Sequence, residues 1–173
     1  MSFLKRIFGA RSERAALLPL YTAIVAAGRD PAWYRDGQVP DTLDGRFDMI
    51  AALTALVLLR LEAAGEEGRR PSALLTETFI DDMDATLRQI GVGDYVVGKH
   101  VGRMMSALGG RLGALRSARE NGALAEAVRR NVFHDAPPSD AAVAWVAARL
   151  EAFDAALAGA DVDALVAGRL PKP

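Results

Sequence analysis

Hydrophobic residues recur every three or four positions along most of the chain, and this spacing is typical of amphipathic α-helices. The clearest apolar stripe contains Leu75, Phe79, Met83, Leu87 and Ile90. Three aspartates, Asp81, Asp82 and Asp84, fall mostly on the other faces of that helix. Gly91 is suited to end the helix, and Asp94 is suited to cap the next one. The sequence therefore predicts a helical hairpin with an acidic outer surface.

The most hydrophobic segment predicts the centre of the fold. Residues 47–62 are apolar on nearly every side, so we expect a buried central helix that the other helices surround. Asp41 or Thr42 can cap its first turn. Arg46 and Asp48 lie at its start, where we expect a partly buried ion pair with a neighbouring helix.

Residues that typically begin or end helices predict the elements next to the central helix. Gly28 ends the first long helix, and Asp30 followed by Pro31 begins a short one. After the central helix we expect an exposed connection at residues 65–70. Pro71 then stands at the start of the acidic helix.

The C-terminal third of the chain continues the helical pattern. It predicts a helix over residues 123–133, another between a cap at Ser139 and a stop at Gly159, and a short one over residues 161–166. No alternating strand pattern of useful length occurs. We therefore expect an all-α fold, a single-domain bundle of about six to eight helices.

The chain is expected to divide into a basic amphipathic segment at residues 1–14, one all-helical domain at 15–168 and a tail at 169–173. In the first segment Phe3, Leu4, Ile7 and Phe8 recur at helical spacing beside basic residues that include Lys5 and Arg6. Such a segment can bind an anionic membrane or ribosomal RNA. The alternative is a terminus that frays or packs on the body.

Composition narrows the class of protein. The chain of 173 residues is 51% hydrophobic and 25% charged, which is typical of a globular domain. A net charge of −1 gives no overall attraction to nucleic acid, so we expect no sequence-specific nucleic-acid partner. The absence of cysteine excludes disulfides, thiolate catalysis and cysteine-ligated metals. The longest apolar run, residues 49–59, is too short to span a bilayer, and residues 1–14 do not form a secretory signal.

A stripe of small residues accompanies the helix after Asp94. Its members are Gly98, Gly102, Ser106, Gly109 and Gly113. Each glycine inside a helix costs about 1 kcal/mol relative to alanine, so several in one helix require a reason. Close approach of a second helix is that reason, and internal packing is favoured over contact with another molecule.

The sequence contains few residues in arrangements that are typical of catalytic or metal sites. His100 and His134, the only histidines, lack ligand partners at helical spacing, so we expect no metal site and no cofactor. The run Asp81-Asp82-Met83-Asp84 is similar to the aspartate-rich motif with which helical isoprenoid enzymes hold magnesium and diphosphate. Ala85 replaces the last carboxylate of that motif, and no second cluster exists. The residues therefore favour binding over catalysis, with a magnesium-dependent helical enzyme as the weakest alternative.

Two stretches resemble the ubiquinol–cytochrome c chaperone family in their order and spacing. The first contains Trp33-Tyr34 and Val39-Pro40-Asp41-Thr42-Leu43-Asp44-Gly45-Arg46-Phe47-Asp48. The second contains Phe79-Ile80-Asp81-Asp82-Met83-Asp84, Leu87-Arg88-Gln89-Ile90-Gly91-Val92-Gly93-Asp94 and Val97-Gly98-Lys99. The resemblance runs from about Leu20 to Arg111. The chain departs from it at Leu108-Gly109-Gly110-Arg111, where family members often carry an aromatic before the final Gly-Arg.

The resemblance implies a non-enzymatic assembly factor for ubiquinol–cytochrome c reductase (complex III), which binds newly made cytochrome b. The related mitochondrial protein works with a small partner chaperone near the ribosomal exit tunnel. A bacterial member is expected in the cytoplasm, peripheral to the inner membrane. The alternative is a membrane-surface or ribosome-associated helical adaptor that uses residues 1–14.

Two groups of candidate residues follow. We expect the client-binding edge to contain Asp81, Asp82, Asp84, Arg88, Asp94, Gly98, Lys99 and Gly102. A structural role is expected for the motif residues Trp33, Asp41, Gly45, Arg46 and Asp48. The competing interpretation of the acidic residues is that they only solvate an exposed helix face.

Overall fold

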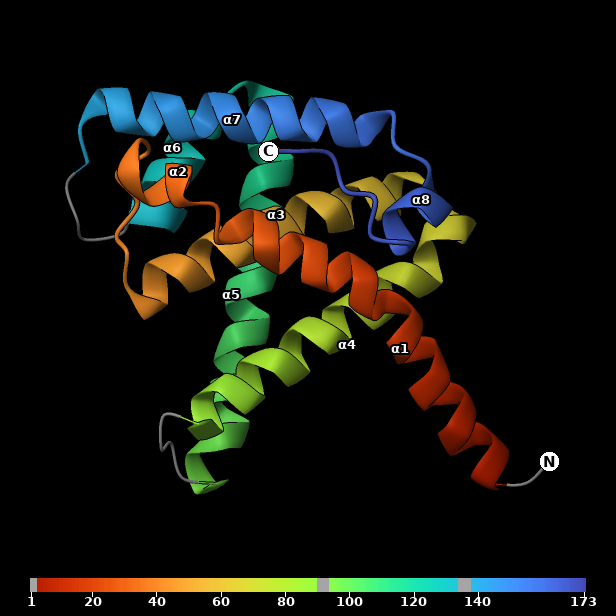
Figure 1. Ribbon diagram of the computed structural model, residues 1–173. Helices are drawn as coiled ribbons and strands as arrows, with labels where there is room; N and C mark the ends of the chain where they lie inside the picture. The colour runs from red at the N-terminus through yellow and green to blue at the C-terminus, as the bar shows by residue number, and fades with distance from the viewer. Residues whose placement is uncertain (1–2, 90–93, 134–137) are drawn as a thin grey trace.

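A computed structural model of the chain describes residues 3–89, 94–133 and 138–173, and this part of the chain is helical and contains no strand (Figure 1). In chain order the helices are α1 (Phe3–Gly28), α2 (Pro31–Arg35), α3 (Leu43–Ala63), α4 (Glu66–Gln89), α5 (Asp94–Asn121), α6 (Leu124–Val128), the π-helical segment η1 (Arg129–Phe133), α7 (Asp140–Ala158) and α8 (Val162–Val166). The predicted all-α, single-domain bundle is confirmed. The side chains of residues 3–14, 87–89, 94–101, 103 and 104 lie outside the described part.

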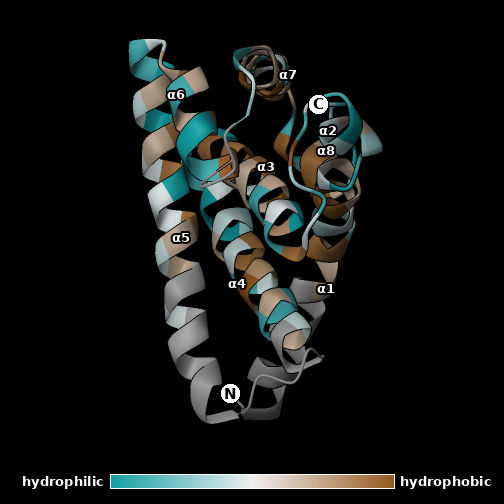
Figure 2. Cartoon of the chain, turned by 90° about the vertical axis from the view of Figure 1, so that its left-hand side faces the viewer, coloured by the Kyte–Doolittle hydropathy of each residue, from teal (hydrophilic) through white to brown (hydrophobic). Residues whose placement is uncertain are grey.

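Helix α3 is the centre of the bundle, as the sequence predicted. Every residue from Met49 to Leu59 is buried, because α3 packs against α1, α4, α5 and α7. Apolar residues gather on α3 and on the parts of α1 and α4 beside it (Figure 2). The one hydroxyl in the buried run, that of Thr54, donates to the Ile50 carbonyl at 2.8 Å. The core therefore contains this polar group without leaving it unsatisfied.

The connection between α3 and α4 is shorter than predicted. Gly65, with a φ of +64°, ends α3, and α4 already begins at Glu66. A Cβ on Gly68 would lie 1.8 Å from the Leu61 carbonyl oxygen, so only glycine permits this close reversal. The predicted loop at residues 65–70 and the predicted helix start at Pro71 are therefore wrong. Pro71 lies inside α4, where its missing N–H removes one hydrogen bond near the helix start.

The turn after α1 explains why an aromatic pair follows it. The N–H of Arg29 donates to the Val25 carbonyl, the indole N–H of Trp33 donates to the Ala27 carbonyl at 2.9 Å, and the Tyr34 hydroxyl donates to the Gly28 carbonyl at 2.6 Å. These bonds satisfy carbonyls at the helix end that have no intrahelical partner. Trp33 is fully buried, with its ring edge-on to Trp145 at 5.8 Å between centroids.

A buried ion pair joins α3 to α5. The Arg111 guanidinium pairs with the Asp48 carboxylate, and the two residues are only 6% and 3% exposed. Arg111 also donates to the Asn131 carbonyl at 3.3 Å and lies 5.4 Å above the Phe47 ring. The expected ion pair at the start of α3 is thus present for Asp48. Arg46 instead pairs with the exposed Asp41 at 2.7 Å, beside the Thr42 cap.

The small residues of α5 face outward, which overturns their predicted role in internal packing. Gly102, Ser106, Gly109 and Gly113 are exposed. Among the described residues, a Cβ on any of these three glycines would meet no atom of another element within 4 Å. The buried side of α5 instead carries Leu108, Leu115 and Ala118, and Gly98 lies outside the described side chains. The stripe of small residues is therefore on the surface wherever it is described.

The structure bears in different ways on the predicted N-terminal segment and on the predicted C-terminal tail. Helix α1 runs without interruption past residue 14, so the division predicted there stays a prediction. In the tail at 169–173, the Pro173 carbonyl accepts a hydrogen bond from Arg149 Nε at 2.9 Å. The tail therefore lies against α7.

Candidate functional site

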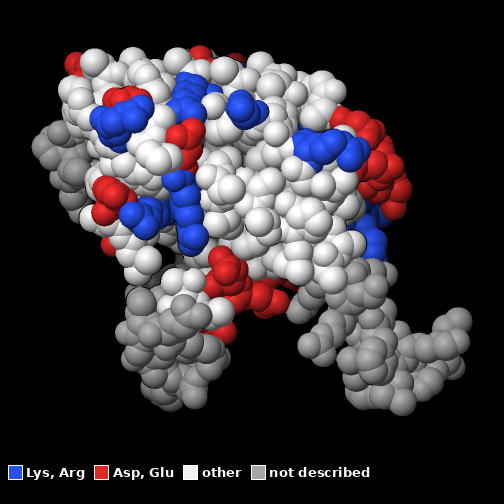
Figure 3. Space-filling view, in the orientation of Figure 1, with Lys and Arg blue, Asp and Glu red and all other residues white. Residues whose placement is uncertain are grey.

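Acidic side chains on α4 form a surface that contains the three aspartates singled out by the sequence, together with Glu77. Glu77 and Asp81 are exposed, whereas Asp82 and Asp84 are half-buried. We call these four residues the acidic surface. Figure 3 shows acidic side chains gathered at the lower edge of the body, where α4 crosses it in Figure 1. Such a surface attracts cationic groups and repels other copies of itself.

Asp82 also holds α4 to α1. Its carboxylate accepts a hydrogen bond from the Tyr21 hydroxyl at 2.7 Å. Tyr21 is 6% exposed, and its burial, followed by this hydrogen bond, raises the pKa of its hydroxyl. Tyr21 therefore stays protonated and remains the donor. The interpretation of Asp82 as purely solvating is corrected, because its carboxylate belongs to the contact between the two helices.

Replacing Tyr21 by phenylalanine is expected to lower the free energy of unfolding by about 1.5–3 kcal/mol, the usual range for a hydrogen bond to a charged group. The ring still fills its site, so the loss reports the hydroxyl alone. Urea unfolding measures it. The matched control is Thr22→Val on the exposed side of α1, which should change stability by less than about 0.5 kcal/mol. An unchanged midpoint for Tyr21→Phe would exclude a structural role for this bond.

The remaining candidates for the client-binding edge lie near the ends of two neighbouring helices. Arg88 belongs to α4, and Asp94, Gly98 and Lys99 belong to α5, but their side chains lie outside the described part. Gly102 is exposed on α5. Helices α4 and α5 pack together, so all of these positions share one hairpin with the acidic surface (Figure 1). Phe3, Lys5, Arg6 and Phe8 belong to α1, and their side chains also lie outside the described part.

The motif residues near α2 fall into two groups. Trp33 and Asp48 are buried, and a Cβ on Gly45 would lie 2.0 Å from the Pro40 carbonyl oxygen. Asp41 and Arg46, in contrast, are exposed and paired. The hydrogen bond from Arg46 lowers the pKa of Asp41.

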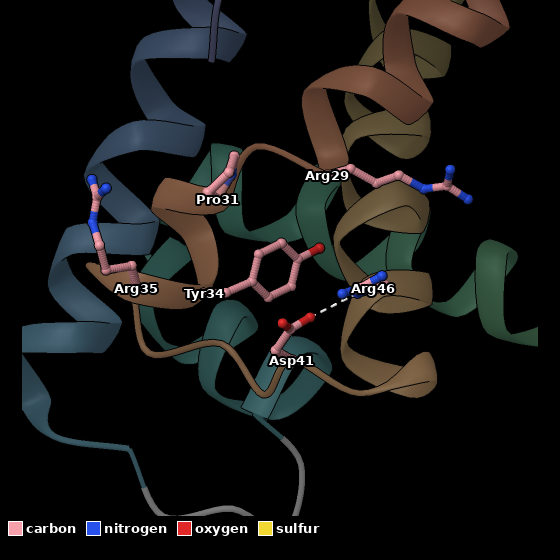
Figure 4. Close-up of a pocket in the computed structure, with 6 residues that line it drawn as sticks. All are labelled: Arg29, Pro31, Tyr34, Arg35, Asp41 and Arg46. Atoms are coloured by element: carbon pink, nitrogen blue, oxygen red, sulfur yellow. Dashed lines mark hydrogen bonds and ion pairs between the residues drawn. The ribbon is translucent and has the colours of Figure 1, made fainter.

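Sequence reasoning missed a basic hollow next to that exposed pair. Its volume is about 440 Å³, and it is lined by Arg29, Pro31, Tyr34, Arg35, Asp41 and Arg46 (Figure 4). The lining comes from the turn after α1, from α2 and from the segment that leads into the first turn of α3. No spacing rule connects these three segments, so only the fold brings the arginines together.

Two further findings concern the described residues alone. No helix among them has the length and apolar character needed to cross a bilayer. No three of their histidine, aspartate or glutamate side chains are grouped so that they could hold a metal ion.

Comparison with known proteins gives two matches. A family model described as ubiquinol-cytochrome C chaperone matches residues 35–170, which include α7 and α8 beyond the motifs noted in the sequence. The crystal structure of the Cbp3 homolog from Brucella abortus matches 99% of this chain and 97% of its own chain, with 29% sequence identity and a TM-score of 0.81. No curated protein matches the chain.

Proposed function

Because the chain belongs to the ubiquinol–cytochrome c chaperone family, we propose that it binds newly made cytochrome b and holds it during assembly of ubiquinol–cytochrome c reductase. The observation that carries the proposal is the family match over residues 35–170, which contains the whole acidic surface. The agreement in fold with the Cbp3 homolog supports it. In this role the protein is a non-enzymatic assembly factor.

The charge of α4 supports a particular mode of binding. The cytoplasmic loops of membrane proteins are enriched in lysine and arginine. An acidic surface complements such loops and speeds their capture. Glu77 and Asp81 are the exposed members of this surface, so they are the residues placed to meet a basic loop of the client. Asp82 and Asp84 contribute their charge from half-buried positions.

The proposed location of the protein follows from its proposed client, cytochrome b. We expect the protein on the cytoplasmic side of a bacterial inner membrane, where cytochrome b is inserted. The basic segment that contains Phe3, Lys5, Arg6 and Phe8 would then face lipid or the ribosome. A small partner chaperone, as in the mitochondrial relatives, would bind elsewhere on the surface.

Reversing charge on the acidic surface tests the proposal. We expect Glu77→Lys combined with Asp81→Lys to reduce capture of cytochrome b on the order of tenfold, because like charges then face each other. A photo-crosslinking amino acid at the exposed Ala85, used in the native bacterium, measures the capture by mass spectrometry. Asp82 is left unchanged, since its hydrogen bond to Tyr21 would confuse binding with stability.

The matched control reverses the exposed Glu120 and Glu151, which lie on α5 and α7 outside the acidic surface. This variant has the same net charge and should capture cytochrome b normally. Equal capture by both variants would remove the acidic surface from the binding site. Capture of lipid or ribosomal protein alone would instead favour the membrane-surface or ribosome-associated adaptor.

A further inference from the structure

We propose that the hollow between the end of α1, α2 and the start of α3 binds a phosphate group, either of a soluble phosphate ester or of an anionic phospholipid headgroup. The site is separate from the acidic surface that is proposed to bind cytochrome b. Three arginines line the hollow against one aspartate. The chain as a whole has a net charge of −1, so this concentration of positive charge is local.

The arrangement of the side chains favours an oxyanion. In Figure 4, Tyr34 stands between Arg35 on one side and Arg29 with Arg46 on the other. The guanidinium of Arg46 lies 6.0 Å from the centre of the Tyr34 ring. The Arg46 guanidinium is therefore placed to donate to a phosphate beside the ring, and guanidinium groups bind phosphate through two parallel bonds. The Arg29 side chain extends away from the ring in Figure 4, so it reaches the same phosphate by a change of rotamer.

Arg29 is available for a ligand because other groups satisfy the carbonyls at the end of α1. The carbonyls that end α1 accept from backbone N–H groups and from Trp33 and Tyr34, so the Arg29 side chain is not needed as a cap. Among the described residues, its guanidinium makes no hydrogen bond or ion pair. The Tyr34 hydroxyl donates to the Gly28 carbonyl, which fixes the backbone immediately before Arg29. An unpaired cation on a fixed backbone is well suited to bind an anion.

Arg46 keeps part of its hydrogen-bonding capacity. Its Nε donates to Asp41 at 2.7 Å, and its two terminal nitrogens remain for a ligand. The pair with Asp41 also orients the guanidinium, which lowers the entropy lost when a ligand binds. Arg35 is engaged by the neighbouring Asp36, so it contributes charge rather than a direct contact.

A second hollow adjoins the first one at two shared lining residues. Its volume is about 560 Å³, and the two hollows share Arg29 and Pro31. Together they are lined by five basic residues, Arg29, Arg35, Arg46, Arg149 and Lys172, and by two acidic ones, Asp30 and Asp41. Leu170 and Pro171 add apolar surface. Figure 3 shows basic side chains distributed over this face. A phosphate at Arg29 with a glycerol group beside it fits this combination.

The test compares vesicles and soluble phosphates on the full chain. Sedimentation with phosphatidylcholine vesicles that contain phosphatidylglycerol, against pure phosphatidylcholine, measures headgroup binding. Titration with inorganic phosphate and glycerol 3-phosphate, followed through the arginine Nε–H signals in NMR, measures the soluble ligands. Arg29→Gln should weaken binding about fivefold, the contribution expected of one basic residue near an anionic surface. Arg29→Lys keeps the charge and should recover part of the loss.

The control is Arg130→Gln, which removes one positive charge from η1 outside both hollows. Loss of vesicle binding in Arg29→Gln alone assigns the ligand to a lipid headgroup. Loss of glycerol 3-phosphate binding in Arg29→Gln alone assigns it to a soluble ester. The proposal is overturned if neither probe binds, or if Arg29→Gln and Arg130→Gln weaken binding equally. Arg29→Gln should leave capture of cytochrome b unchanged, so this inference and the proposed function fail independently.

Discussion

Replacing Arg111 by methionine is expected to lower the free energy of unfolding by about 3–5 kcal/mol, the usual cost of removing one partner of a buried ion pair. Asp48 is 3% exposed and would keep its carboxylate in the core without the guanidinium. The same change releases the Asn131 carbonyl and empties the space above Phe47. Urea unfolding followed by circular dichroism measures the loss.

A double-mutant cycle separates the ion pair from the packing. Asp48→Leu alone should also be strongly destabilising, because Arg111 then loses its counter-charge. Combining Asp48→Leu with Arg111→Met removes both charges, and the pair of apolar residues should recover most of the stability. If the double variant were as unstable as the sum of the two single ones, packing rather than charge would account for the loss. The cycle bears on function because Arg111 joins the α4–α5 hairpin to the central helix.

The features that sequence predicted well are those decided by neighbours along the chain. The burial of α3 follows from an apolar pattern on every side. The caps at Asp30 and Ser139 follow from side-chain oxygens that accept hydrogen bonds from N–H groups two or three residues further along the chain. These signals need no knowledge of the rest of the fold. The same is true of the three aspartates of the acidic surface, since Asp81, Asp82 and Asp84 share one helix.

The predictions that were wrong concern glycines, because a glycine can lie in a loop, at a close approach of two segments or on an exposed helix face. In α5 the glycines were interpreted as a packing surface, but Gly102, Gly109 and Gly113 face outward. Near α4, in contrast, Gly68 was placed in a loop although it is the residue that lets α4 pass the Leu61 carbonyl. The sequence shows only that a side chain is absent. Whether the missing side chain permits a close approach of another segment or simply faces solvent depends on where the neighbouring helix lies.

The contacts at the candidate sites could not be predicted, because they join distant parts of the chain. Tyr21 and Asp82 are 61 residues apart, and Asp48 and Arg111 are 63 apart. The basic hollow takes Arg29 from the turn after α1 and Arg46 from α3. Isolated basic residues of this kind occur throughout the sequence and carry no local pattern. Only the crossing of the helices decides which of them meet.

Replacing Trp33 by alanine is expected to cost about 3–5 kcal/mol, the usual range for removing a large aromatic residue from a core. The side chain is fully buried, lies edge-on to Trp145, and has the Arg149 guanidinium 4.6 Å from its centre. Trp33→Phe is the matched variant. It keeps most of the apolar volume but loses the N–H donor to Ala27, so a loss of about 1 kcal/mol is expected. Thermal unfolding of the two variants distinguishes volume from hydrogen bonding.

The two variants also separate stability from the phosphate site. The Ala27 carbonyl still accepts from the Asp30 N–H at 3.2 Å when the indole is absent, so Trp33→Phe should keep the end of α1 in place. Arg29 then stays at the hollow, and binding of glycerol 3-phosphate should be retained. In Trp33→Ala the support beneath α2 is lost, and Tyr34 no longer fixes the backbone before Arg29. Binding should fall even at temperatures where the protein is folded. Equal binding by Trp33→Ala and the wild type would show that Arg29 needs no support from this turn.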